Sequence, residues 1–130
     1  MNIFYVDGDP SAAAQALCDQ HSNKMILEST QLLASAHHVT LGTVPEVFPP
    51  LTHRYHPCSR WTRASIEHYR WLSRHAIALC DEFNLRFEHE HSWRQIVIWL
   101  IENEPELPDA GFSEPPQVMP GGGTGRLRTG

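Results

Sequence analysis

Six polar side chains recur at helical spacing in the first third of the chain. They are His21, Lys24, Glu28, Gln31, Ser35 and His38. Steps of three and four residues place all six along one line of a helix. A carboxylate close to a histidine and a lysine has the groups needed for acid–base chemistry, because each charge shifts the pKa of the others. The alternative is the solvated face of an amphipathic helix, where a Lys–Glu pair contributes roughly a few tenths of a kcal/mol.

A line of basic residues follows in the middle of the chain, at Arg60, Arg63, Arg70 and Arg74. Arginines on one helix face can contact several backbone phosphates, even in a chain with a net charge of −5. Trp61 and Trp71 lie beside them in the sequence and would be placed to stack on bases, whereas we expect Tyr69 in the core. The alternative is again a solvated face, in which Glu67 pairs with the arginines.

The chain has nine histidines, so metal binding is one hypothesis for its function. The segments His53-x-x-His56-x-Cys58 and His89-x-His91 have short spacings, and imidazole with thiolate suits zinc. No spacing matches a two-plus-two zinc pattern, and the first segment lies in a proline-rich loop. We therefore predict no metal and no cofactor, and keep a zinc-dependent hydrolase as a lesser alternative.

The sequence predicts one short strand and three main helices. The strand is the β-prone run Asn2–Val6, which ends in a turn where Asp9 can cap a helix beginning at Pro10. That helix reaches about Val39, with a bend near residues 19–23, and Gly42 is its predicted stop.

The second helix begins at Ser59 and carries an apolar stripe opposite the arginines. A capping-box sequence, Ser92 to Gln95, precedes a third helix that ends near Glu102. The proline- and glycine-rich residues 105–130 cannot bury enough apolar surface to order themselves and form an irregular tail or a draped segment. We therefore predict a mostly α, compact single-domain helical bundle over residues 1–104.

Composition limits the classes of protein to consider. The 130 residues are 41% hydrophobic, enough for one domain with its own core. Cys18, Cys58 and Cys80 are widely spaced and form no C-x-x-C pair, which predicts a reducing compartment and no disulfide partner. The first ten residues carry neither a signal peptide nor a membrane span, so we expect a cytoplasmic protein without a membrane partner.

The block "LCDQHSNKMILE", residues 17–28, resembles the active-site helix of the phage pyrimidine-dimer DNA glycosylases, the endonuclease V family. In that family an Asp-Gln-His sequence is followed by a catalytic glutamate seven residues after the histidine, as in His21 and Glu28. Residues 68–87 look like the family's second long helix. The opening residues and the pattern around residues 56–72 also resemble small uncharacterised phage proteins.

The resemblance implies a compact helical protein that flips a nucleotide out of DNA and attacks the sugar C1′ with its N-terminal amine. Glu28 would then act as the acid–base residue on the Schiff-base intermediate, and His21 would position it or bind phosphate. The amine of Met1 is the first candidate nucleophile and Lys24 the second. The expected partner is DNA. The rival hypothesis is a non-enzymatic phage-type protein whose polar lines bind nucleic acid or a small ligand.

Overall fold

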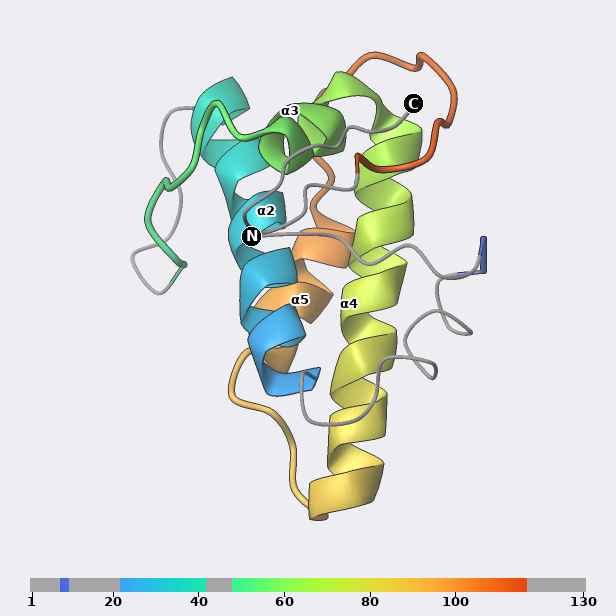
Figure 1. The fold of residues 1–130 in the computed structure, drawn as a ribbon. Helices are drawn as coiled ribbons and strands as arrows, with labels where there is room; N and C mark the ends of the chain where they lie inside the picture. The colour runs from blue at the N-terminus through green and yellow to red at the C-terminus, as the bar shows by residue number, and fades with distance from the viewer. Residues whose placement is uncertain (1–7, 10–21, 42–47, 117–130) are drawn as a thin grey trace, which may run out of the picture.

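The computed structural model describes residues 8–9, 22–41 and 48–116 (Figure 1). Four helices lie in these ranges: α2 (Ser22–Leu41), α3 (Pro57–Ala64), α4 (Ile66–Phe87) and α5 (Arg94–Glu102). No strand occurs among the described residues, so the predicted mostly helical class is confirmed. The strand predicted at Asn2–Val6 lies outside them.

The two long helices, α2 and α4, run side by side in opposite directions, and α5 packs behind them (Figure 1). The short helix α3 covers one end of this layer. Helix α2 contributes a fully buried face that includes Ile26, Leu32 and Leu33, while α4 contributes Leu72 and Leu79. Burying side chains of this size stabilises the fold by about 1.5–3 kcal/mol each. The end of α2 at Leu41 agrees with the stop predicted at Gly42.

The prediction of a single helix from Ser59 is wrong, because the helix is interrupted at Ser65. Helix α3 begins two residues earlier, with Pro57 in its first turn and the imidazole of His56 accepting from the Cys58 N–H at 3.0 Å. Ser65 is extended, and its hydroxyl caps α4 by accepting from the Glu67 N–H. The Ile66 N–H donates to the Pro108 carbonyl at 2.7 Å, so a distant segment satisfies the backbone at the break.

The third predicted helix is confirmed as α5, with its end at Glu102, but the predicted capping box is not formed. The cap residue is Trp93, which makes no side-chain capping bond. Its N–H donates to the ring of His91 at 3.1 Å, and the Gln95 amide donates to Glu90 at 3.1 Å. Partners before the helix therefore replace those that a serine–glutamine box would supply.

Residues 103–116 are irregular, as predicted, and lie along α3 and α4 (Figure 1). The Trp61 indole donates to the Ser113 carbonyl at 2.9 Å, and the Ser113 N–H donates to the ring of His68 at 3.0 Å. The Ala110 N–H also donates to the Ser65 hydroxyl at 3.2 Å. Of the two predicted alternatives, an irregular tail or a draped segment, these residues therefore form the draped segment. The domain boundary after residue 104 stays a prediction, and residues 117–130 lie outside the described ranges.

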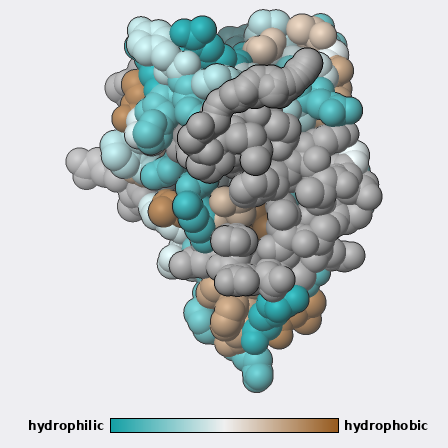
Figure 2. All heavy atoms as spheres, viewed as in Figure 1, coloured by the Kyte–Doolittle hydropathy of each residue, from teal (hydrophilic) through white to brown (hydrophobic). Residues whose placement is uncertain are grey.

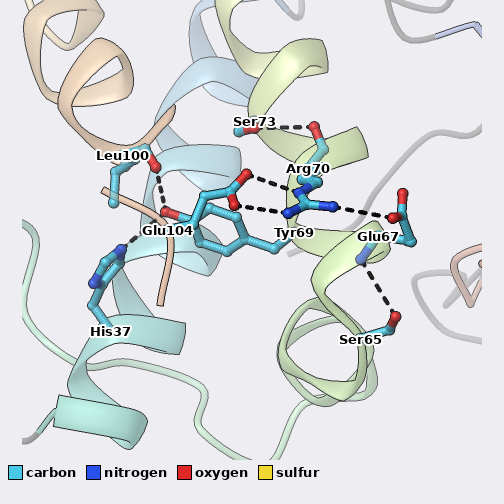
Figure 3. A network of polar contacts seen from close by, with 8 residues as sticks. All are labelled: His37, Ser65, Glu67, Tyr69, Arg70, Ser73, Leu100 and Glu104. Carbon is cyan, nitrogen blue, oxygen red and sulfur yellow. Dashed lines mark hydrogen bonds and ion pairs between the residues drawn. The ribbon is translucent and has the colours of Figure 1, made fainter. Parts of the chain in front are cut away.

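A chain of buried hydrogen bonds joins α2, α4 and α5 (Figure 3). The Tyr69 hydroxyl donates to the Leu100 carbonyl at 2.7 Å and lies 2.9 Å from the Nε2 atom of His37. Because the hydroxyl proton is used on Leu100, Nε2 of His37 is the donor to the Tyr69 oxygen. Tyr69 is fully buried, which confirms its predicted place in the core, and burial raises its pKa. This network fixes the register of the three helices.

Lowering the pH should destabilise the fold through His37. Burial, with a smaller effect of His38, lowers the pKa of His37 from 6.5 to about 4, and a hydrogen bond to the Asn103 backbone acts in the opposite direction. The unfolded chain therefore takes up a proton that the folded chain does not. The stabilisation is complete above the unfolded pKa of 6.5 and falls by up to about 3 kcal/mol as the pH drops from there to the folded pKa of about 4.

Urea denaturation at a series of pH values measures this slope. The His37→Gln variant, which keeps a donor near Tyr69, should show a flatter dependence than the parent chain. Replacement of the exposed His89 by glutamine is the control and should leave the slope unchanged. An equal slope in parent and His37→Gln would contradict the role of His37.

Candidate catalytic and DNA-contact site

The polar line on α2 passes from solvent into the protein. The Lys24 side chain is 70% exposed, whereas Glu28 is only 14% exposed, and their charged atoms lie 4.0 Å apart. Further along, Ser35 is buried and donates to the Thr52 carbonyl at 3.3 Å, while His38 contacts the Pro49 carbonyl at 2.9 Å. The loop before α3 therefore covers the later part of the line, and a purely solvated face is excluded there. His21 lies outside the described residues.

The loop before α3 carries two histidines, His53 and His56. The rings of His53 and His56 are 6.3 Å apart. Burial, with the neighbouring His53, lowers the pKa of His56, and the negative charge of Glu28 opposes this shift. The carboxylate of α2 and the imidazole before α3 thus lie within electrostatic reach of each other. The sequence marked His56 only as a weak zinc candidate and missed this pairing.

The protonation of His56 follows from its hydrogen bond. Its Nδ1 atom accepts from the Cys58 N–H, so in the neutral ring the proton sits on Nε2. The ring therefore presents a donor on the side away from α3. A neutral donor and a half-buried carboxylate are complementary partners for proton transfer or for a developing charge.

One arginine of the 53–56 loop and two of α3 lie near one another. We call these residues, Arg54, Arg60 and Arg63, the arginine cluster. The Arg63 guanidinium donates to the Arg54 carbonyl at 2.9 Å. Burial, followed by the charges of Arg54 and Arg60, lowers the pKa of Arg63, which shows that the three guanidinium groups share one region. Within residues 22–41 and 48–116, none of the three forms an ion pair.

The predicted basic line is divided by the break at Ser65. Arg70 on α4 donates to both carboxylate oxygens of Glu104, at 2.9 and 3.1 Å, and to Glu67 at 3.2 Å (Figure 3). Its charge is therefore neutralised within the chain. The pairing with Glu67 is the one that the sequence offered as the alternative to phosphate binding. Arg74 is exposed on the next turn of α4. Arg54, which sequence reasoning missed, takes the place of Arg70 among the accessible guanidinium groups.

The structure places Trp61 and Trp71, which the sequence suggested as base-stacking residues, in the core. Both are buried, at 7% and 6% exposure. Trp61 stacks on the ring of His68 at 4.2 Å, and Trp71 stacks on His75 at 4.9 Å. The Trp71 indole also donates to the Gly8 carbonyl at 2.9 Å. These indoles are parts of the core because their faces and their N–H groups already have partners.

The residues considered for zinc serve other contacts. No three His, Cys, Asp or Glu side chains in the described part of the chain come together in a way that could hold a metal ion. Cys58 and Cys80 are buried thiols, and Cys58 lies 3.8 Å from the Pro116 carbonyl. His91 packs against the ring of Phe83 at 4.7 Å.

The surface near α3 is mainly polar. In the space-filling view, most of the coloured atoms over the end formed by α3 and its preceding loop are hydrophilic (Figure 2). Across the described ranges, no helix has both the length and the apolar character needed to cross a membrane.

Comparison with known proteins identifies the family. A family model described as pyrimidine dimer DNA glycosylase matches residues 1–95, well over half of the chain. The chain belongs to this family, which confirms the resemblance drawn from residues 17–28. The match contains α2, α3 and α4, and so includes Glu28, the 53–56 loop and the arginine cluster. No curated protein and no solved structure matches the chain.

Family membership supports a pyrimidine-dimer DNA glycosylase-like function, with DNA as substrate or partner. The individual site residues are a separate question, which the geometry around Glu28 addresses.

Proposed function

We propose that the protein removes a damaged pyrimidine from DNA through an amine nucleophile, with Glu28 as the acid–base residue. The observation that carries this proposal is the Glu28 carboxylate, whose side chain is 14% exposed, within electrostatic reach of His56 on the loop that also carries Arg54 of the arginine cluster. An enclosed carboxylate is shielded from bulk water, and nearby cations bind the phosphates that flank a lesion. A base-excision site needs both features.

The proposed reaction begins with attack of an amine on C1′ of the lesion nucleotide. The C1′–N bond breaks, the base leaves with the electron pair, and opening of the sugar ring gives a Schiff base between enzyme and sugar. The Glu28 carboxylate would stabilise the positive charge of this intermediate and transfer protons to and from the sugar. Removal of a C2′ proton then expels the 3′ phosphate, which is the lyase step.

Two amines are candidates for the nucleophile. A lysine acts at neutral pH when burial or a neighbouring cation favours its neutral amine. Lys24 has different surroundings, since it is 70% exposed and lies 4.0 Å from the Glu28 carboxylate. A terminal α-amine has an ordinary pKa of about 8 and needs no such help. We therefore place Met1 first and Lys24 second, although Met1 lies outside the described residues.

The arginine cluster is the proposed phosphate clamp, with Arg74 as a further contact and His21 as a positioning or phosphate-binding group. Arg70 is a weaker candidate because Glu104 and Glu67 already take its donors. DNA as the partner agrees with the cytoplasmic location expected from the sequence.

Borohydride trapping tests the proposal. The full chain is incubated with duplexes that carry an abasic site or a thymine dimer, and the reductant converts any Schiff base to a stable amine link. We expect a covalent protein–DNA adduct, which mass mapping places at Met1, and we expect the Lys24→Gln variant to retain it. An adduct lost in Lys24→Gln would make Lys24 the nucleophile.

Two other results would count against parts of the proposal. Base release without any adduct would mean that Glu28 activates water and that the covalent step is absent. Tight DNA binding with neither base release nor adduct would support the rival, a non-enzymatic binding protein.

A further inference from the structure

The tip of the 53–56 loop carries an exposed aromatic ring. Tyr55 is 68% exposed, whereas Trp61 and Trp71 are buried. The guanidinium carbons of Arg54 and Arg60 each lie 5.6 Å from the centre of the Tyr55 ring. Two cations thus lie within cation–π distance of one exposed aromatic ring.

The loop that presents Tyr55 is held at both ends. The His56 N–H donates to the His53 carbonyl at 3.0 Å, which closes the turn, and Arg63 donates to the Arg54 carbonyl at 2.9 Å. Before the turn, Ser35 of α2 donates to the Thr52 carbonyl. The ring therefore projects from a turn that hydrogen bonds hold in place.

The backbone at His53 is also unusual. His53 has a φ of 51°, in the left-handed region that residues other than glycine seldom adopt. Strained backbone of this kind persists where surrounding contacts enforce it, and it concentrates at functional sites. Here those contacts are the closed turn and the hydrogen bond from Arg63 of α3.

We propose that Tyr55 is the wedge of this site: it inserts beside the extruded nucleotide and stacks on a base of the damaged duplex, while Arg54 and Arg60 hold the flanking phosphates. The proposal rests on the proposed function, because a wedge is needed only if a nucleotide leaves the stack. Enzymes that act on a base must extrude it, and an aromatic side chain in the vacated space restores the lost stacking. Tyr55 directly precedes His56, the imidazole that lies within electrostatic reach of Glu28.

The test uses binding and not turnover. The probe is a duplex that contains a tetrahydrofuran abasic analogue next to 2-aminopurine, compared with the same duplex without the analogue. Stacking of one base on an aromatic ring contributes roughly a tenfold or larger gain in affinity. We expect Tyr55→Ala to lose about tenfold or more in affinity for the analogue duplex, with unchanged affinity for the intact one. We also expect loss of the 2-aminopurine quenching seen with the parent chain.

Tyr55→Phe is the conservative variant and should retain both affinity and quenching, since the ring is kept. Phe87→Ala removes an exposed ring at the far end of α4 and is the matched control. Equal losses of affinity on both duplexes, or none, would overturn the wedge proposal. So would a parent chain that does not prefer the analogue duplex. Base release by the parent chain is measured separately, so failure of the wedge and failure of glycosylase activity are distinguishable.

Discussion

Replacing Glu28 by glutamine should lower the rate of base release by a factor of about 10²–10⁴, the range typical of a lost acid–base group. Glutamine keeps the volume and the hydrogen-bonding capacity of the side chain but cannot ionise. The carboxylate is 14% exposed and its nearest ion-pair partner is the exposed Lys24, so the fold should tolerate the change. Single-turnover cleavage of the glycosidic bond in a thymine-dimer duplex measures the effect, read as thymine released after photoreversal of the dimer, and thermal unfolding checks the fold.

Glu102→Gln is the matched control for Glu28→Gln. It removes an exposed carboxylate from the end of α5 that has no role in the proposed reaction, and it should leave base release unchanged. A Glu28→Gln variant that retains activity within a few-fold of the parent would rule out the acid–base role. Loss of activity together with loss of fold would be resolved by Glu28→Asp, which keeps the charge on a shorter side chain and should retain part of the activity.

Neutralising Arg54 and Arg60 together should weaken DNA binding and lower its salt dependence. Each phosphate contact contributes about 0.9 to the slope of log affinity against log salt for duplex DNA, so the Arg54→Gln/Arg60→Gln variant should lose nearly 2. Both side chains are exposed, and the bond that anchors the loop uses the Arg54 carbonyl, which the substitution keeps. A salt titration of affinity for an undamaged duplex measures both quantities.

Arg70→Gln is the informative comparison for this pair. Its guanidinium is already committed to Glu104 and Glu67, so its replacement should reduce stability more than it reduces DNA affinity. Arg74→Gln should lower the salt slope by at most about one contact. If Arg70→Gln weakens binding as much as the double variant does, the phosphate-binding face lies along α4 and the arginine cluster is not the clamp.

Local sequence determined the helical class, the ends of α2 and α5, and which residues of α2 share a face. The apolar period predicts α2 and α5, Gly42 marks the end of α2, and the three-residue and four-residue steps put Lys24 and Glu28 together, where the structure has them. These features depend on contacts within one or two turns, and such contacts are encoded by neighbouring residues. The same short block, residues 17–28, was enough to indicate the family.

Tertiary structure decided which of those faces are accessible. The break at Ser65 depends on Pro108, Arg70 is neutralised by Glu104, and Trp61 is covered by Ser113, all through partners that are distant in sequence. The electrostatic effect of Glu28 on His56 likewise requires the loop before α3 to lie close to α2. Sequence periodicity gives the direction of a side chain but not what lies opposite it. Whether an arginine or an aromatic ring can reach DNA is therefore set by long-range packing.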